Sequence, residues 1–170
     1  AALLSGLKEV KFEEGTTQIA ERLFKDCAAL EDVIIPDSVT EIETEAFYKC
    51  TGLKSVEFGK NVEVIWNGAF RECTGLVQVE LPDTVTRIEQ DAFAGDTALN
   101  KINLPSGLTY LGHSAFWSCT SLTEIEIPAS LEKTANEYDY TGPFAQSGLK
   151  EVTFEEGTFQ IAERLFKDCA

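Results

Sequence analysis

Hydrophobic residues recur along this chain with a dominant period of 23 residues. Phenylalanine marks the period once in every unit, at Phe24, Phe47, Phe70, Phe93, Phe116, Phe144 and Phe166. Each unit begins with a leucine: Leu7, Leu30, Leu53, Leu76, Leu99, Leu122 and Leu149. A fixed period in the twenties is typical of solenoids, in which each unit buries its apolar face only against its neighbours. The pattern predicts a single elongated domain over residues 1–170, built from about seven stacked units.

Each unit predicts two short extended stretches. Three residues after the leucine comes a β-branched residue such as Val33, and two further on a second apolar residue such as Ile35, in the alternation of a half-buried strand. Proline follows four of these segments and ends the pairing there, at Pro36, Pro82, Pro105 and Pro128. We expect residues 33–35 and their equivalents to stack as a parallel sheet along one face. A later apolar pair, such as Val39 and Ile42, predicts a second stretch on another side.

The unit ends with the pattern Ala-Phe-x-x-Cys, seen whole at residues 46–50, 69–73 and 115–119. We expect one helical or 3₁₀ turn in this segment, which drives the phenylalanine into the core. A glycine or small residue before the next leucine, as at Gly52, suits the turn back.

The complete unit resembles the BspA-like leucine-rich repeats, whose pattern is L-x-x-I-x-I-P-x-x-V-x-x-I-x-x-x-A-F-x-x-C. Residues 30–50 carry it almost unmodified, whereas Asp96 and Ser147 replace the cysteine and Thr134 replaces the isoleucine. The resemblance implies a right-handed leucine-rich-repeat solenoid, mostly β with short helical or 3₁₀ turns. It also implies a non-catalytic protein-binding or adhesion module of a bacterial secreted or cell-surface protein. The alternatives are a structural spacer that displays another domain and a carbohydrate-binding surface.

The two ends of the chain are nearly identical. Residues 6–28 and 148–170 match at 21 of 23 positions and differ only at Lys11/Thr153 and Thr17/Phe159. Both ends stop within a unit and lack the polar capping element that a solenoid end normally needs. We expect a fragment of a longer array, with a recent duplication inside a complete small protein as the alternative.

Five extra residues interrupt the repeat between Thr134 and Phe144. Because a solenoid must loop out an insertion, we expect Tyr138 and Tyr140 to lie on a protrusion.

The composition argues against several classes of protein. The net charge of −15 disfavours nucleic-acid binding, which needs clustered Lys and Arg, and favours a cationic partner. No stretch approaches the ~20 apolar residues of a membrane span, so we expect no membrane insertion. Residues 1–4 lack the basic flank of a signal peptide, and a secreted or cell-surface location rests on the family resemblance.

The residues that carry chemistry do not form a catalytic pattern. All five cysteines share one repeat position: Cys27, Cys50, Cys73, Cys119 and Cys169. Their spacing does not suit zinc, and a ladder holds Cβ atoms further apart than the ~3.8 Å of a disulfide, which favours buried thiols over either alternative. The lone histidine, His113, lies in a variable column and is expected to be solvated. Phosphate-binding loops and nucleophile motifs do not occur, so we expect no catalytic residue, metal or cofactor.

The candidate binding surface is the outward side of the first predicted strand. Seven of its 14 outward positions are acidic and two are lysine. This pattern predicts recognition of a basic segment of a protein partner, such as a host or matrix protein, through Glu57, Glu80, Glu124 and Glu126. A solvated surface that resists edge pairing explains the same pattern.

Aromatic residues form a second candidate group. Trp117 stands where sister units have Lys25 and Arg71, so it should be partly exposed, and Tyr138 and Tyr140 should face a ligand. Exposed Trp and Tyr suit protein contacts or sugar stacking, although such residues also lie flat against a neighbouring coil. The sequence leaves the oligomeric state open.

Overall fold

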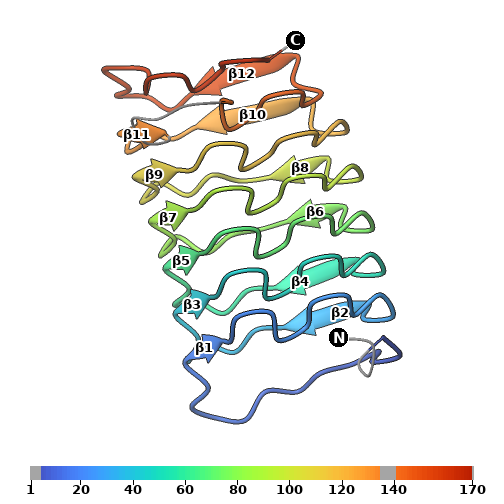
Figure 1. Cartoon of the computed structure of the whole chain (residues 1–170). Coiled ribbons are helices and arrows are strands. Elements are labelled where there is room, and N and C mark those ends of the chain that lie inside the picture. The colour runs from blue at the N-terminus through green and yellow to red at the C-terminus, as the bar shows by residue number, and fades with distance from the viewer. Residues whose placement is uncertain (1–4, 135–140, 170) are drawn as a thin grey trace.

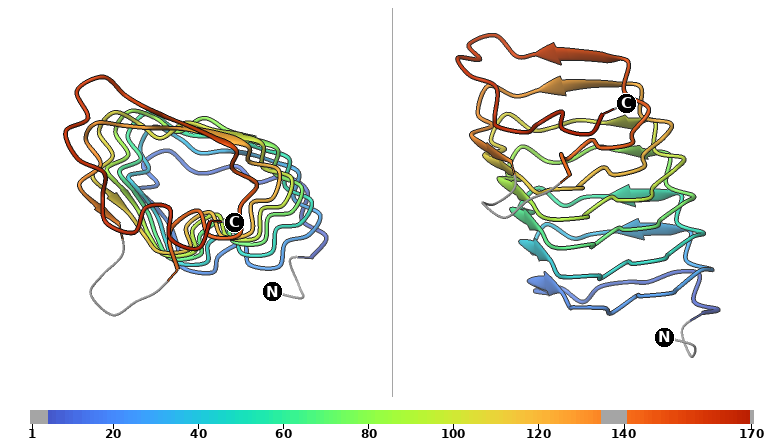
Figure 2. Two further views of the ribbon diagram at one scale, coloured as in Figure 1. Left: turned by 90° about the horizontal axis from the view of Figure 1, so that it is seen from above. Right: turned by 45° about the horizontal axis from the view of Figure 1, so that its top comes forward.

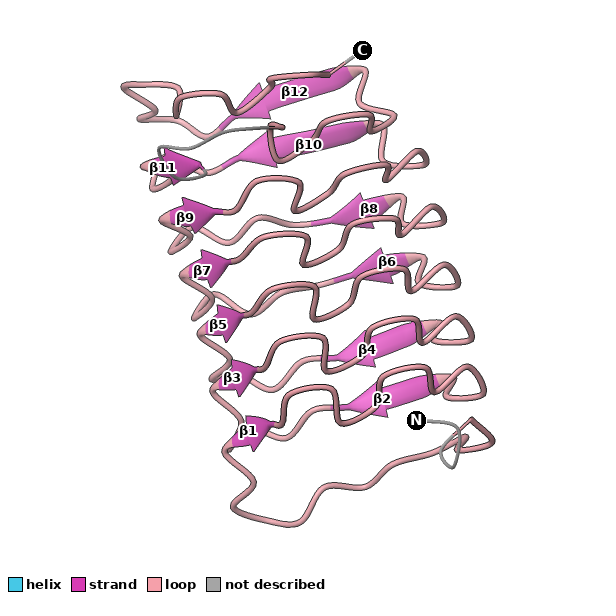
Figure 3. Ribbon diagram, viewed as in Figure 1, coloured by secondary structure: helices cyan, strands magenta, loops and turns pink. Residues whose placement is uncertain are grey.

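A computed structural model describes residues 5–134 and 141–169 of the chain as a β-solenoid of stacked coils (Figure 1). Short parallel strands recur on two sides of the stack. Their bounds are β1 Gln18–Ile19, β2 Asp32–Ile34, β3 Glu41–Ile42, β4 Ser55–Glu57, β5 Val64–Ile65, β6 Gln78–Val79, β7 Arg87–Ile88, β8 Lys101–Ile102, β9 Tyr110–Leu111, β10 Glu124–Ile127, β11 Lys133–Thr134 and β12 Glu151–Phe154. Within these two ranges the chain forms no helix, and turns connect the strands (Figure 3).

The continuous sheet comes from the second predicted stretch. Strands β1, β3, β5, β7, β9 and β11 pair in that order, all parallel. Ile19 is the register partner of Ile42, and Ile42 of Ile65, so the 23-residue period of the sequence is also the register of the sheet. The first predicted stretch forms three separate pairs instead: β2 with β4, β6 with β8, and β10 with β12. Both predicted sets of parallel strands therefore exist, but only one is unbroken.

The phenylalanine row fills the interior of the coils. Phe47, Phe70, Phe93, Phe116 and Phe144 are fully buried. Neighbouring rings stack with centroids 5.0 to 5.4 Å apart from Phe24 to Phe144. Seen along the stack, the coils enclose one common interior (Figure 2). The predicted aromatic core is confirmed.

The predicted helical turn in Ala-Phe-x-x-Cys is wrong. The amides of Glu45, Phe47 and Lys49 donate to the next coil, at 2.7 to 2.9 Å. The amides between them donate three residues back along the chain, at 3.1 Å. Glu45 and Lys49 adopt φ values of 54° and 59°, in the left-handed region that a right-handed helix excludes. The segment is a series of β-turns that adds its own hydrogen-bond ladder between coils and still buries Phe47.

The predicted protrusion lies outside the described residues, and with it Tyr138 and Tyr140. Its flanks are described on both sides. Strand β11 ends at the buried Thr134, and Phe144 continues the aromatic row against Phe116.

Candidate functional site

The candidate partner-binding carboxylates lie on the outward side of β4, β6 and β10, which we call the strand face. In β10 exposed and buried residues alternate, so Glu124 and Glu126 face solvent while Ile125 and Ile127 are buried. Glu57 ends β4 with an exposed side chain, and Glu80 follows β6 in the same way. The structure confirms that these four carboxylates point outward, as the period-two pattern predicts.

A groove of about 720 Å³ opens on the strand face. Glu80, Glu124 and Glu126 line it around an apolar floor. The floor consists of Val56, Val79, Ile102, Leu104 and Ile125. A second hollow of about 530 Å³ is lined by Glu57 and Glu80 and shares Val56 with the first. Lys101 also lines the first hollow and Lys60 the second, so the walls are mainly but not wholly acidic. The shape of the hollows is not visible in the sequence because side chains from several coils create it.

The carboxylates of the strand face form no ion pair in the part of the chain that the structure describes. They belong to Glu57, Glu80, Glu124 and Glu126. Glu124 is moreover the register partner of Glu151 in β12, so like charges stand directly opposite on neighbouring strands. Like charges in this arrangement are destabilising, and a bound cation relieves the repulsion.

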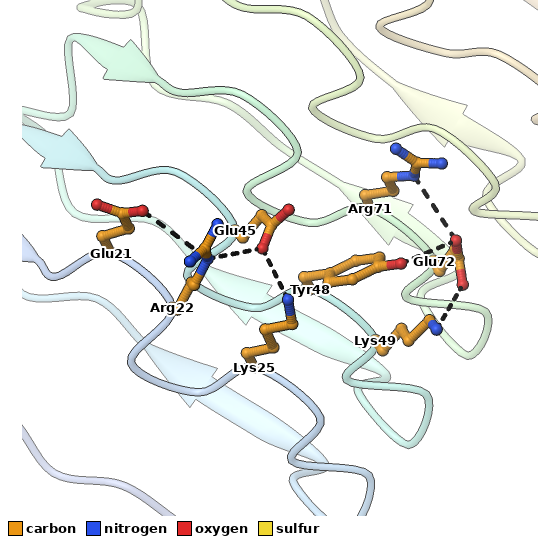
Figure 4. A network of polar contacts seen from close by, with 8 residues as sticks. All are labelled: Glu21, Arg22, Lys25, Glu45, Tyr48, Lys49, Arg71 and Glu72. Atoms are coloured by element: carbon orange, nitrogen blue, oxygen red, sulfur yellow. Dashed lines mark hydrogen bonds and ion pairs between the residues drawn. The ribbon is translucent and has the colours of Figure 1, made fainter. Parts of the chain in front are cut away.

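The turns on another side of the coils show the opposite arrangement (Figure 4). The Glu45 carboxylate accepts from Lys25 Nζ at 2.9 Å and from Arg22 Nε at 3.0 Å. The hydrogen bond from Lys25 is the main reason that the pKa of Glu45 lies below its usual value. Glu72 lies 3.6 Å from Arg71 in the same network. Acidic side chains here are neutralised within the protein.

Tyr48 lies at the centre of this network. Lys25 Nζ, Lys49 Nζ and Arg71 Cζ are 4.9, 5.2 and 5.8 Å from the centre of its ring, within cation–π range. Its hydroxyl contacts the Glu72 carboxylate at 3.4 Å. The tyrosine is half-buried and its surroundings are already occupied by cations, so it contributes to coil packing.

Comparison with known proteins identifies the repeat. The chain matches the family model described as the BspA type leucine rich repeat region, in six copies, over residues 3–74 and 41–170. The chain belongs to the BspA-type leucine-rich-repeat family. No curated protein sequence is significantly similar to it.

Solved structures of similar proteins support the assignment of this chain to the BspA-type family. A leucine rich cell surface protein from Faecalibacterium prausnitzii is 36% identical, with a TM-score of 0.68 over 71% of this chain and 32% of its own. The leucine rich repeat protein of T. pallidum is 28% identical, with a TM-score of 0.73 over 81% of this chain and 62% of its own. The pneumococcal vaccine antigen PcpA, at 24% identity and a TM-score of 0.73, shares the fold. The chain thus spans about a third of the first protein and under two thirds of the second.

Two further residues that the sequence analysis singled out lie in less open positions in this BspA-type solenoid. Trp117 is half-buried, in agreement with the expected partial exposure. His113, which the sequence predicts to be a solvated surface residue, is half-buried and therefore less exposed than expected. Across the described ranges, no helix is long and apolar enough to span a membrane. Within the same ranges, no three His, Cys, Asp or Glu side chains are grouped to hold a metal ion.

The cysteine column forms a ladder of thiols, as predicted. Cys50, Cys73 and Cys119 are fully buried, and each thiol donates to the carbonyl of a phenylalanine in the preceding coil at 3.0 to 3.2 Å. Burial raises the pKa of Cys50 to about 12 and those of Cys73 and Cys119 well above the usual value. Such thiols are poor nucleophiles and act as packing groups.

The sequence analysis did not predict that Asp96 is a buried acid. It replaces a cysteine in this column and is fully buried, with Oδ1 accepting the Cys73 amide at 2.8 Å. Among the described atoms, Oδ2 has no hydrogen-bond partner. Burial raises the pKa of Asp96 well above its usual value. Its place in a column of core residues was the available signal that this acid is interior.

Proposed function

We propose that this chain is a non-catalytic protein-binding module of a bacterial secreted or cell-surface leucine-rich-repeat protein. Its strand face binds a basic segment of a protein partner, such as a host or matrix protein. Lysine or arginine side chains of that segment pair with Glu57, Glu80, Glu124 and Glu126. The apolar stems of these lysine and arginine side chains, or apolar side chains next to them in the segment, lie on the floor of the groove.

The observation that carries the proposal is the contrast between the two charged surfaces. Carboxylates on the turn side, such as Glu45, have partners within the protein, whereas those of the strand face have none among the described residues. Unpaired carboxylates around an apolar floor supply both electrostatic attraction and area to bury. A surface that served solubility alone needs charge but gains nothing from an apolar hollow.

The similar protein from F. prausnitzii is described as a cell surface protein, which supports a surface location for this chain. An extended array of coils also suits recognition, because solenoids present long continuous surfaces to partners.

The proposal is tested by replacing Glu57, Glu80 and Glu126 together by Lys. The probe is an extended lysine-rich peptide, with immobilised matrix proteins as a second target. The matched control replaces Glu13, Glu14 and Glu156, which are exposed but lie outside both hollows, and it changes the net charge equally. We expect the strand-face variant to lose affinity by about tenfold or more, or ~1.4 kcal/mol, and the control to lose much less.

Equal losses in both variants would show non-specific charge attraction rather than a site. If the strand-face variant retains every interaction of the parent, the solenoid acts as a structural spacer instead.

A further inference from the structure

The sheet on the strand face is interrupted at alternate interfaces between coils. Within the described residues, β2 pairs with β4, β6 with β8 and β10 with β12, but no backbone hydrogen bond joins β4 to β6 or β8 to β10. The same two interfaces are intact on another side of the coils, where β5 pairs with β7 and β9 with β11. The amides of Phe70 and Phe116 also cross them, at 2.8 and 2.7 Å. The interruptions are therefore confined to the strand face.

Proline explains the interruptions. Between β10 and β12, which pair fully, the Glu155 amide donates to the Ile127 carbonyl at 2.9 Å. Three earlier coils have proline at the position of Glu155: Pro82, Pro105 and Pro128. Proline has no amide hydrogen, so it cannot make this bond. The carbonyls that lack the donor are the equivalents of Ile127 in the preceding coils: Phe58, Leu81 and Leu104.

Asn103 bridges one of these three interfaces. Its Nδ2 donates to the Leu81 carbonyl at 2.9 Å, and its Oδ1 accepts the Leu81 amide at 2.7 Å. The side-chain amide thus takes the place of a backbone partner for Leu81. At the other two interfaces the position of Asn103 is occupied by Glu80 and Glu126. An ionised carboxylate has no hydrogen to donate, so these two side chains cannot form the same bridge.

Each unbridged interface has a carboxylate and an unpaired carbonyl in one hollow. Glu126 and Leu104 both line the larger groove, and Glu80 and Phe58 both line the second hollow. In the described part of the chain, no backbone amide donates to the carbonyl of Leu104 or Phe58. Both groups at each interface are hydrogen-bond acceptors. A ligand that complements them must therefore donate to two acceptors at once, and positive charge strengthens its bond to the carboxylate.

We propose that each unbridged interface is a subsite for the guanidinium group of an arginine in the partner segment. At one interface the guanidinium donates to the carboxylate of Glu80 and to the carbonyl of Phe58. At the other it donates to Glu126 and to the carbonyl of Leu104. A guanidinium suits two acceptors on different coils because its N–H groups lie on separate nitrogens in a planar fork. The inference rests on the proposed function and narrows its partner to a segment that contains arginine.

Glu57 and Thr153 lie in the same column but at interfaces that the backbone already closes. The Ile35 amide donates to the Glu57 carbonyl at 2.8 Å, and β12, which contains Thr153, pairs with β10 over four residues. A carboxylate at either position attracts a cation by charge alone. These positions therefore separate the effect of charge from that of a bridged interface.

The binding test uses an extended arginine-containing peptide and the same peptide with lysine in place of arginine, measured by calorimetry. The parent should bind the arginine peptide more tightly. Asn103→Glu removes the internal bridge and creates a third subsite, so it should tighten arginine-peptide binding by about tenfold, the value of one charged hydrogen bond. The matched control, Thr153→Glu, adds the same charge to the same column at a closed interface and should tighten binding much less.

A second test needs no ligand. Glu126→Asn supplies the side chain of Asn103 at an unbridged interface, so it should bridge Leu104 as Asn103 bridges Leu81. Hydrogen exchange should be faster at the Leu104 amide than at the Leu81 amide in the parent, and the variant should slow exchange at Leu104. Glu126→Gln removes the same charge with a side chain one methylene longer and should leave that exchange rate unchanged.

The outcomes separate this inference from the proposed function. Equal tightening by Asn103→Glu and Thr153→Glu, or tighter binding of the lysine peptide, would overturn the arginine subsites and leave recognition by charge intact. Unchanged exchange at Leu104 in Glu126→Asn would also overturn them, because the interface would then not accept a bridging donor. If neither peptide binds the parent or any variant, the inference and the proposed function fail together.

Discussion

The amide of Cys73 donates a 2.8 Å hydrogen bond to the carboxylate of Asp96, one coil further along the solenoid. Both side chains are fully buried, in a column otherwise formed mainly by cysteines. A thiol in this column donates to a phenylalanine carbonyl, which a carboxylate cannot do unless it is protonated. The solenoid therefore contains an interior acid whose protonation should affect its stability.

The first prediction concerns Asp96→Asn. The neutral amide keeps the acceptor for the Cys73 amide and removes the acid, so we expect stabilisation of about 1–3 kcal/mol at neutral pH. Burial raises the pKa of Asp96 above its unfolded value, so its contribution to stability is greatest below the unfolded pKa and falls as the pH rises toward the folded pKa. Thermal unfolding of parent and variant from about pH 4 to about pH 7 should show the variant's advantage growing with pH.

Asp83→Asn is the control for this experiment. It removes the same charge from an exposed side chain and should change stability by less than about 0.5 kcal/mol. An advantage of Asp96→Asn that shrinks with rising pH would contradict the assignment of an interior acid.

The second prediction concerns the aromatic row. Phe70 stacks on Phe47 at 5.0 Å and on Phe93 at 5.4 Å, so Phe70→Ala should cost ~3–5 kcal/mol in the free energy of unfolding. Phe159→Ala, on a ring that is 99% exposed, should cost less than about 0.5 kcal/mol. Chemical denaturation measures the free energy of unfolding of both variants. Similar losses in the two would contradict the assignment of Phe70 to the core.

The third prediction concerns thiol reactivity. Burial raises the pKa of every one of the five thiols, but Cys169 is only half-buried, whereas Cys27, Cys50, Cys73 and Cys119 are fully buried. Since a reagent must reach the thiolate, a thiol reagent applied to the native protein should modify Cys169 first and reach the other four only after unfolding. Peptide mapping after brief labelling identifies the sites. Equal labelling of all five would show that the ladder opens readily.

The fourth prediction concerns Glu45, which binds Arg22 and Lys25 across the coil boundary. Glu45→Gln should lower stability by about 0.5–1 kcal/mol, because the pair is partly screened by solvent. The pKa of Glu45 is lowered, so its contribution is present above the unfolded pKa and is lost as the pH falls through the folded pKa. Glu126→Gln, at a carboxylate without an ion pair in the described structure, should cause no loss.

The repeat was predictable because every coil meets an almost identical neighbour. One spacing therefore determines the register of β1 with β3, the row from Phe24 to Phe144 and the outward direction of Glu124. The turns were not predictable to the same degree. Glu45 and Lys49 adopt left-handed backbone angles without glycine, so composition offered no sign that the segment is not helical.

The candidate site was predictable as a set of outward residues but not as a shape. Alternation within strands indicates which side chains are exposed, whereas the groove between Glu80 and Glu126 depends on the sizes of side chains from several coils. The missing ion pairs on the strand face likewise depend on where each lysine and arginine lies in space. Charge counting alone does not separate the paired carboxylate of Glu45 from the unpaired one of Glu80.

The most direct test of strand-face recognition is an NMR titration of the isotope-labelled chain with an extended lysine-rich peptide. Binding to the groove should shift the backbone amides of β8 and β10, around Asn103 and Glu126, and leave the turn network around Tyr48 unchanged. Shifts confined to the turn network, or no shifts at any peptide concentration, would contradict the proposed recognition of a basic segment by this face.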